Sequence, residues 1–204
     1  MFYETADNRH GLPHDPFKSC IAPRPIGWIS TLSRAGAVNL APYSFFNGVA
    51  SDPPMVMFSS NGPAPRPDKD TLLNCRETGE FVFNMATWDL REAMNRTSAP
   101  IAHGVDEFAL AGLETAPSRL VAPPRVKAAP IHMECAVHTI VDLPCESPGG
   151  RNAMIVGRVL GIHIADHALS DGMVDMAKIR PIARLGYMDY TRVDEVFEML
   201  RPTA

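Results

Sequence analysis

The stretch PRPIGWISTLSRAGAVNLAPYSFFN, residues 23–47, combines two strand-like segments with an unusual polar and aromatic ending. Segments 26–32 and 38–43 are rich in apolar and β-branched residues, and segment 33–36 between them ends in glycine, which is typical of a hairpin loop. The stretch then closes with four residues that a buried strand does not need: Ser44, Phe45, Phe46 and Asn47. It therefore predicts an antiparallel hairpin and raises the question of a ligand at its end.

The composition indicates an ordinary globular domain. The 204 residues are 46% hydrophobic and 21% charged, and the 19 prolines argue against long helices. The net charge of −4, without a run of Lys or Arg, makes nucleic acid and anionic membranes poor partners. No apolar stretch approaches the ~18 residues that span a bilayer, and residues 1–10 lack the pattern of a signal peptide. We therefore expect one domain, residues 1–204, in the cytoplasm, with no nucleic-acid or membrane partner.

Strands dominate the rest of the chain. Segments 55–59 and 80–86 are short and apolar or alternating, and segments 131–143 and 153–165 alternate over a greater length. The proline-rich region 99–130 shows little periodicity and is predicted to be a long excursion over the surface. Hairpin-connected strands without β-α-β alternation favour an antiparallel barrel over a parallel sheet.

Helices are predicted to be few, short and peripheral. Asp68 or Asp70 can cap one helix, and Gly79 ends it. A second helix follows up to about residue 96, and the N-terminal arm, residues 1–20, is irregular. A C-terminal helix within 192–204 is predicted because four apolar residues recur at i, i+3, i+4 and i+7: Val193, Val196, Phe197 and Leu200.

Polar residues share one face of the long segment 131–143. His132, Glu134 and His138 can in principle form a metal site there, but a solvent-facing polar strand face is the commoner arrangement. Cys135 is predicted to be a core thiol on the opposite face. The four scattered cysteines predict free thiols rather than a disulfide framework. We predict no metal site.

The motifs of familiar catalytic machinery are missing. The sequence contains no G-x-S-x-G, H-E-x-x-H, P-loop or G-x-G-x-x-G pattern. No catalytic residue is therefore predicted, and binding features become the main guide to function.

Two neighbouring segments could receive a flat, hydrogen-bonding ring. Trp28, Ser30 and Thr31 lie on the first strand of the hairpin, and the cluster 44–47 ends the second. Aromatic faces, hydroxyls and an amide at strand ends suit a planar heterocycle. The alternative is that the two phenylalanines are core residues and that the polar residues begin a loop.

A second region could receive an anion. Ser59 and Ser60 end a strand, and Lys69 and Thr71 lie at the start of the predicted helix. A lysine at a helix N-terminus is unfavourable unless an anion binds there, where free N–H groups and the helix dipole favour it. The alternative is an ordinary surface lysine. Together the two regions predict one ligand with a ring at one end and a phosphate at the other.

The chain resembles the flavin reductase-like proteins, which have the FMN-binding split barrel. Eight pieces carry the resemblance in order along the chain: RPIGWIST (24–31), NLAPYSFFN (39–47), PPMVMFS (53–59), KDTLLN (69–74), GEFVFN (79–84), VDEF (105–108), EC (134–135) and RLGYMDY (184–190). The resemblance implies a Greek-key antiparallel split barrel with a few short helices. It also implies a homodimer that binds FMN near the subunit interface.

The resemblance also implies roles for individual residues. Along the isoalloxazine it places Trp28, Ser30, Thr31, Ser44, Phe45, Phe46 and Asn47. At the ribityl phosphate it places Ser59, Ser60, Lys69 and Thr71, with Asp70 capping the helix and His103 as a further flavin contact. His163 and Arg184 are implied at the nicotinamide side or the dimer contact. The short proline-rich loop 61–68 departs from relatives, so FAD remains an alternative to FMN.

The implied activity is reduction of flavin by NAD(P)H through hydride transfer, with reduced flavin passing to a partner oxygenase. This chemistry belongs to the cofactor, which agrees with the missing catalytic motifs. An FMN-binding electron carrier with little NAD(P)H activity needs the same pocket and is the main alternative. A split-barrel oxidase acting on a phosphorylated pyridoxamine would need a second basic cluster, which the sequence lacks. The preference between NADH and NADPH stays open.

Overall fold

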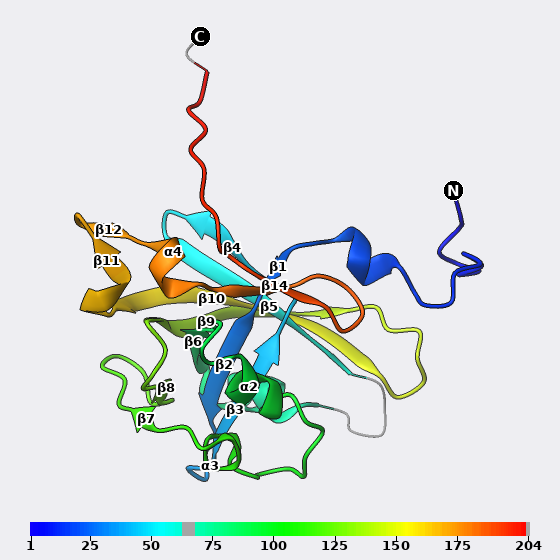
Figure 1. Ribbon diagram of the computed structural model, residues 1–204. Coiled ribbons are helices and arrows are strands. Elements are labelled where there is room, and N and C mark those ends of the chain that lie inside the picture. Colours follow the sequence, from blue (N-terminus) through cyan, green and yellow to red (C-terminus); the bar gives the residue numbers. More distant parts are fainter. Residues whose placement is uncertain (63–67, 203–204) are drawn as a thin grey trace.

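A computed structural model describes residues 1–62 and 68–202 of the chain (Figure 1). Its central element is a seven-stranded sheet with the order β3-β2-β6-β9-β10-β5-β4, in which every pairing is antiparallel. In chain order these strands are β2 (Gly27–Leu32), β3 (Val38–Tyr43), β4 (Phe46–Ser51), β5 (Pro54–Gly62), β6 (Glu80–Met85), β9 (Ile131–Leu143) and β10 (Arg151–Ile164). The prediction of mainly antiparallel β structure is confirmed.

The sheet is open within the described part of the chain. Its edge strands β3 and β4 are not hydrogen-bonded to each other, so the described residues form no closed barrel. The hairpin predicted from residues 23–47 is present, since β2 pairs with β3 from Gly27–Tyr43 to Leu32–Val38. The sequence did not predict β4: Phe46 and Asn47 were expected to end the hairpin, and they instead begin a strand that pairs with β5.

Short elements surround the main sheet. A three-stranded sheet combines β1 (Arg24–Pro25), β13 (Ile182–Arg184) and β14 (Tyr190–Arg192), and two small hairpins pair β7 (Thr115–Ala116) with β8 (Arg125–Val126) and β11 (Leu169–Ser170) with β12 (Met173–Val174). The helices are α1 (Asp70–Thr78), α2 (Arg91–Arg96), α3 (Glu107–Ala111) and α4 (Met176–Ile179), with 3-10 turns at Phe17–Cys20 and Asp166–Ala168. No helix in the described ranges is long and apolar enough to cross a membrane.

Strand β2 is buried on both faces because it separates two hydrophobic cores. One core contains Ile29 and Phe81 of the sheet and Leu72 of α1. The other contains Trp28 and receives Phe108 of α3. Alternate side chains of a strand point to opposite faces, so a continuous apolar strand with few charges serves both cores. The excursion 99–130 supplies part of the second core, and its helix α3 was not predicted.

The predicted C-terminal helix is wrong. Strand β14 ends at Arg192, and residues 193–202 form no regular structure and extend away from the sheets (Figure 1). Four of the tail's apolar side chains are exposed: Val196, Phe197, Met199 and Leu200. A helix this short needs a surface for its apolar face, and the described residues of this chain do not provide one in this arrangement. The proline-rich loop 61–68, with its suggested consequence for FAD, falls largely on residues 63–67, outside the described residues.

The close packing of β10 against β6 generates a test of the first core. A Cβ atom at Gly157 would lie 2.4 Å from two ring atoms of the buried Phe81. We expect Gly157→Ala to lower the free energy of unfolding by about 1–3 kcal/mol, because overpacking forces side chains and backbone to shift. Urea denaturation measures this change. Gly48→Ala is the matched control, since its Cβ would meet no atom closer than 4.0 Å; equal stability of the two variants would contradict the packing argument.

Candidate functional site

A cavity of about 480 Å³ lies between β3, the start of α1, the segment 97–101 and α3. Three of the predicted site residues line it, namely Lys69, Asp70 and Thr71. The volume falls within the range of small-molecule sites, about 300–1,000 Å³. The structure therefore brings Lys69 and Thr71 to a concave surface, whereas Ser59 and Ser60, the other two residues predicted at the phosphate, do not line it.

Lys69 is a cation at this cavity without an acidic partner. No carboxylate in the described part of the chain lies within 4.0 Å of its Nζ atom. The ammonium is 5.7 Å from the centre of the Tyr43 ring. Lys69 is an exposed residue at the rim of the cavity, and partial loss of water contact, with the nearby Lys18 second, lowers its pKa. A bound anion would relieve both effects.

Tyr43 gives independent support for a polar ligand. The residue is 6% exposed and lines the cavity, yet no group in the described residues completes a hydrogen bond with its hydroxyl. Burial raises the pKa of Tyr43, and the hydroxyls of Thr71 and Ser60 oppose that shift. The Thr71 and Ser60 hydroxyls approach this group, yet no hydrogen bond of normal geometry reaches it within the described residues. Since buried hydroxyls are normally hydrogen-bonded, spare bonding capacity here, beside Lys69, fits an oxygen-rich ligand.

Asp70 has a different role from the one predicted. The N-cap position of α1 is Lys69, no side chain caps the helix, and Asp70 is its first residue. The Asp70 carboxylate instead contacts the excursion, with Oδ1 2.7 Å from His103 Nδ1 and Oδ2 accepting the Gly104 N–H at 3.1 Å. The predicted cap is therefore wrong, and the contact brings His103 to the edge of the cavity. The first N–H groups of α1 remain without a side-chain cap.

The polar residues predicted on β2 are enclosed by protein. Trp28, Ser30 and Thr31 have no exposed surface. Trp28 Nε1 donates to Thr97 Oγ1 at 2.9 Å, and Ser30 Oγ donates to the Pro124 carbonyl at 2.6 Å. Thr31 accepts from two buried amides, Asn39 and Asn74. These side chains build the wall behind the cavity, and their direct contact with a cofactor stays a prediction.

The residues of the cluster 44–47 have different surroundings in the structure. The Phe46 ring stacks on Phe83, with centroids 4.7 Å apart and an interplanar angle of 3°, so Phe46 packs against the first core. The Phe45 ring lies 5.9 Å from the Arg24 guanidinium and faces the β1–β13–β14 sheet. Asn47 is exposed, and its Oδ1 accepts its neighbour's N–H at 2.9 Å. Both phenylalanines are partly exposed, and within the described residues Phe45 is the one whose ring stacks on no other aromatic ring.

The two serines at the end of β5 lie next to this cluster. The Ser59 N–H donates to the Phe45 carbonyl at 2.8 Å, which joins the predicted ring and phosphate regions. Ser60 is 3% exposed and its hydroxyl lies close to Tyr43. Ser44 is partly exposed beside them.

Sequence reasoning missed Glu107 as a site residue. This carboxylate lines the cavity, is 6% exposed, and accepts the Leu40 N–H at 3.0 Å. Burial raises its pKa, although the hydrogen bond from Leu40 opposes the shift. The residue lies within the VDEF piece, but nothing in the local pattern shows that its side chain returns to β3.

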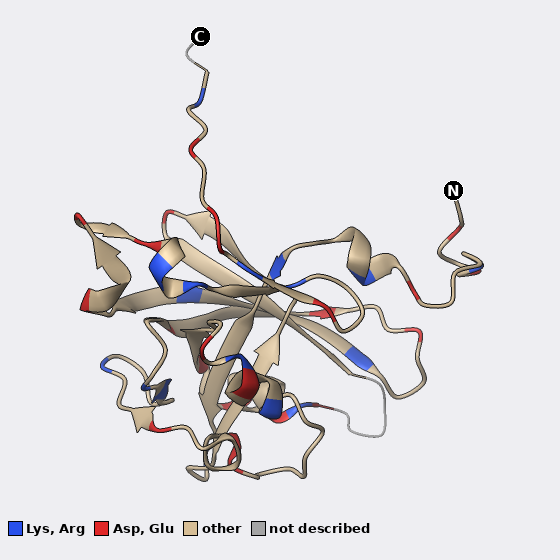
Figure 2. Cartoon of the chain, viewed as in Figure 1, with Lys and Arg blue, Asp and Glu red and all other residues tan. Residues whose placement is uncertain are grey.

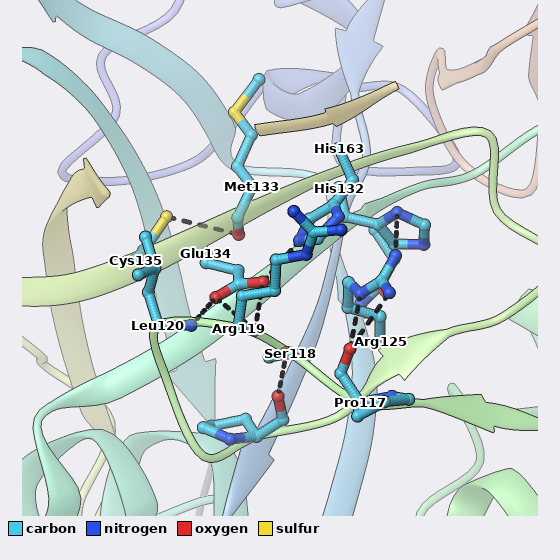
Figure 3. Close-up of polar contacts among 12 residues, drawn as sticks. Pro117, Ser118, Arg119, Leu120, Arg125, His132, Met133, Glu134, Cys135 and His163 are labelled. Atoms are coloured by element: carbon cyan, nitrogen blue, oxygen red, sulfur yellow. Dashed lines mark hydrogen bonds and ion pairs between the residues drawn. The ribbon is translucent and has the colours of Figure 1, made fainter. Parts of the chain in front are cut away.

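A second group of titratable side chains lies where the excursion crosses β9 and β10 (Figure 3). The Glu134 carboxylate has no exposed surface and accepts three hydrogen bonds, from Arg119 N–H at 2.8 Å, Leu120 N–H at 2.6 Å and His163 Nε2 at 2.5 Å. Burial opposes its ionisation, but the bonds from His163 and the two amides lower its pKa overall. Glu134 is thus a buried anion that holds residues 119–120 on the sheet.

The polar face of β9 was predicted to face solvent, and this prediction is wrong for most of its length. His132 is 3% exposed, and its Nε2 donates to the Val126 carbonyl at 2.8 Å, so the excursion covers this face. His138 lies beyond the covered part and is exposed. Within residues 1–62 and 68–202, no group of three His, Cys, Asp or Glu side chains is arranged to hold a metal ion. The prediction that Cys135 is a core thiol is confirmed, since it has no exposed surface.

His132 makes stability depend on pH. Burial lowers the pKa of His132 to about 4, from 6.5 in the unfolded chain. Between these values the unfolded chain binds a proton that the folded chain does not, so stability falls as pH falls, by up to about 3 kcal/mol. We expect His132→Gln to flatten the dependence of the unfolding free energy on pH from 6.5 to 4, measured by urea titration. His138→Gln should keep the wild-type slope; parallel slopes for all three proteins would contradict this assignment.

Comparison with known proteins agrees with this architecture. The model of the flavin reductase like domain matches residues 19–186. The structure of nitrilotriacetate monooxygenase component B from Bacillus cereus is 31% identical, covers 98% of both chains and gives a TM-score of 0.87. A protein named as a flavin reductase with a split barrel domain, from Shewanella frigidimarina, is 21% identical, with 98% of this chain and 94% of that chain covered and a TM-score of 0.79.

A third solved structure has a different described role. Flavoredoxin of Desulfovibrio vulgaris is 19% identical, with 88% of this chain and 91% of that chain covered and a TM-score of 0.75. At this identity, and at that of the Shewanella protein, the likeness shows the fold alone. The domain match covers most of the sequence, and the motifs between residues 24 and 190 pointed to the same group. The chain therefore belongs to the flavin reductase-like family.

Proposed function

We propose that this chain is an NAD(P)H-dependent flavin reductase that binds FMN in the cavity beside Lys69. Three neighbouring features at the start of α1 carry the proposal. Within the described residues, Lys69 has no carboxylate within 4.0 Å, the Tyr43 hydroxyl has no hydrogen-bond partner, and no side chain caps the helix. Each of the three features favours a phosphate, and the family is a flavin-binding one.

The donor set fits a flavin phosphate. Lys69 would supply a positive charge, Thr71 and Ser60 would supply hydroxyls, and the first N–H groups of α1 would point at the phosphate oxygens. The His103–Asp70 contact would hold the excursion over this end of the site. Ser59 would contribute at the junction with the ring.

The ring end would be formed by the turn between β3 and β4. All four residues of the cluster 44–47 are exposed or partly exposed, and Phe46 is the one whose ring stacks on Phe83. Phe46 would support Phe45 from the core rather than touch the ring. Bound FMN would supply the redox chemistry by accepting a hydride from NAD(P)H. The role of the protein would be to orient the two molecules and exclude water.

A homodimer is part of the proposal. Strand β10 exposes three apolar side chains, Leu160, Ile162 and Ile164, to 42, 54 and 42% respectively. Exposed apolar strand surface of this kind favours association with a second copy. The component B relative further suggests a partner oxygenase that receives reduced flavin. The flavoredoxin neighbour keeps an electron carrier as the second candidate, because both functions need the same site.

Removing the charge of Lys69 tests the phosphate assignment. We expect Lys69→Ala to weaken FMN binding about 10- to 100-fold, because a charge-assisted contact contributes roughly 1.5–3 kcal/mol. Flavin fluorescence titration measures the dissociation constant. Lys127→Ala is the matched control, since Lys127 pairs with Glu114 on the exposed β7–β8 hairpin. Equal affinities for both variants would make Lys69 an ordinary surface residue.

Steady-state kinetics separate the reductase from the carrier. We expect the purified protein to bind flavin with a yellow spectrum and to oxidise NADH or NADPH when FMN is added, because the site would bring the two molecules together. FAD in place of FMN measures flavin selectivity. Tight FMN binding without nicotinamide oxidation would favour the carrier, whereas a protein that ignores both flavins would refute the proposal.

A further inference from the structure

The C-terminal tail, residues 193–202, carries an apolar face with nothing to pack against in the described chain. Phe197 is 78% exposed and Leu200 is 82% exposed. Together with Val193 and Val196 they repeat at i, i+3, i+4 and i+7, which is the anchor pattern of a helix bound in a groove. The opposite side of the pattern is acidic, with Asp194, Glu195 and Glu198.

A cavity of about 530 Å³ between α2 and the β13–β14 strands has the complementary character. Its apolar lining includes Trp88, Met94, Ile182 and Met188. Three arginines line it as well: Arg91, Arg184 and Arg192. The guanidinium groups of Arg91 and Arg192 lie 4.0 and 4.6 Å from the Trp88 ring centre. We call this surface the Trp88 pocket; it combines an aromatic base with a cationic rim.

We propose that the tail of one copy of this chain docks, as a short helix, into the Trp88 pocket of a second copy. The Phe197 and Leu200 side chains would enter the apolar part of the pocket. Glu195 and Glu198 would meet the arginine rim, where Arg91 already pairs with Glu92 and Arg192 with Asp194, and where Arg184 has no carboxylate within 4.0 Å among the described residues. The tail would fold as it binds, which explains why its helical pattern produces no helix in a single chain.

The path of the chain favours a second copy over the tail's own pocket. The Val193 N–H donates to the Pro181 carbonyl at 2.9 Å, which fixes the start of the tail alongside β13. From there the chain runs away from its own sheets (Figure 2), and of its acidic residues only Asp194 is paired within the described chain, with Arg192 at 2.6 Å. As a helix, the ten tail residues span about 15 Å, so the pocket of the second copy would lie close to the point where the tail leaves its own sheet. Two such exchanges related by a twofold axis would close a dimer.

Hydrogen exchange of the tail amides in the full-length protein tests the proposal. The tail variant is Phe197→Ser/Leu200→Ser, and the pocket variant is Arg91→Glu. Arg96→Glu is the matched control, because Arg96 is on the same helix and does not line the pocket. We expect the tail amides of the wild type and the control to exchange at least tenfold more slowly than those of the other two variants.

Coexpression of the tail variant with the pocket variant distinguishes the second copy from the same copy. In a mixed dimer the pocket variant keeps an intact tail and the tail variant keeps an intact pocket. We therefore expect protection to return to the intact tail, which mass spectrometry distinguishes from the mutated tail by its sequence. Its return also shows that both variants fold. If the wild-type tail is protected but mixing the variants does not restore protection, the tail binds the pocket of its own chain and the proposal is overturned. A wild-type tail without protection would also overturn it, because the tail would then not dock at all. The inference rests on the homodimer of the proposed function. Its test measures hydrogen exchange of the tail and not flavin binding, so its outcome is independent of the FMN titration.

Discussion

The buried carboxylate of Glu134 is the constraint on which the arrangement of the excursion depends. It has no exposed surface, and it remains ionised because His163 and the amides of Arg119 and Leu120 donate to it. Removing any one donor would leave part of a charge unsatisfied in a dry environment, which is far more costly than losing a surface contact. The long proline-rich segment is therefore held to the sheet by hydrogen bonds as much as by apolar packing.

A second polar network repeats this attachment on the neighbouring strands. Asn84 on β6 donates to the Trp28 carbonyl and the Ser30 hydroxyl, and its oxygen accepts the Val126 N–H at 2.7 Å. Ser30 in turn donates to the Pro124 carbonyl. Phe108 and Val126 are thereby kept in the second core, and α3 stays against β3. Glu107 at the start of α3 then reaches Leu40 and forms one wall of the candidate site.

The candidate site lies where these supports converge. One side is β3, one side is the start of α1, and the rest belongs to the excursion and the segment after α2. The rigid part is the sheet; among the described residues, the Tyr43 hydroxyl lacks a hydrogen-bond partner and Lys69 lacks a carboxylate within 4.0 Å. Rigid walls with a few unsatisfied polar atoms are what a preorganised phosphate site requires, since binding then costs little reorganisation.

Much of the fold was predictable because it depends on local pattern. Alternation over 131–143 and the glycine-containing turn 33–36 specify strands and a hairpin whatever surrounds them. The anion region was predictable for a related reason: a lysine at a helix start conflicts with the helix dipole, and that conflict is visible in the chain itself. The open edges of the sheet, where a barrel was predicted, and the role of Asp70 were not predictable in this way, because both depend on which segment lies opposite.

The sequence by itself determined most of the long strands, the helix α1 and the family, and it predicted the two ends of the candidate site. Only the tertiary structure decided which polar residues are buried, since His132 and Glu134 lie beneath the excursion. It also decided that the Phe46 ring stacks on Phe83 and that the pattern 193–200 forms no helix. The physical reason is the same in each case. Period and propensity act between neighbours in sequence, whereas burial depends on a covering surface supplied from far along the chain or from another molecule.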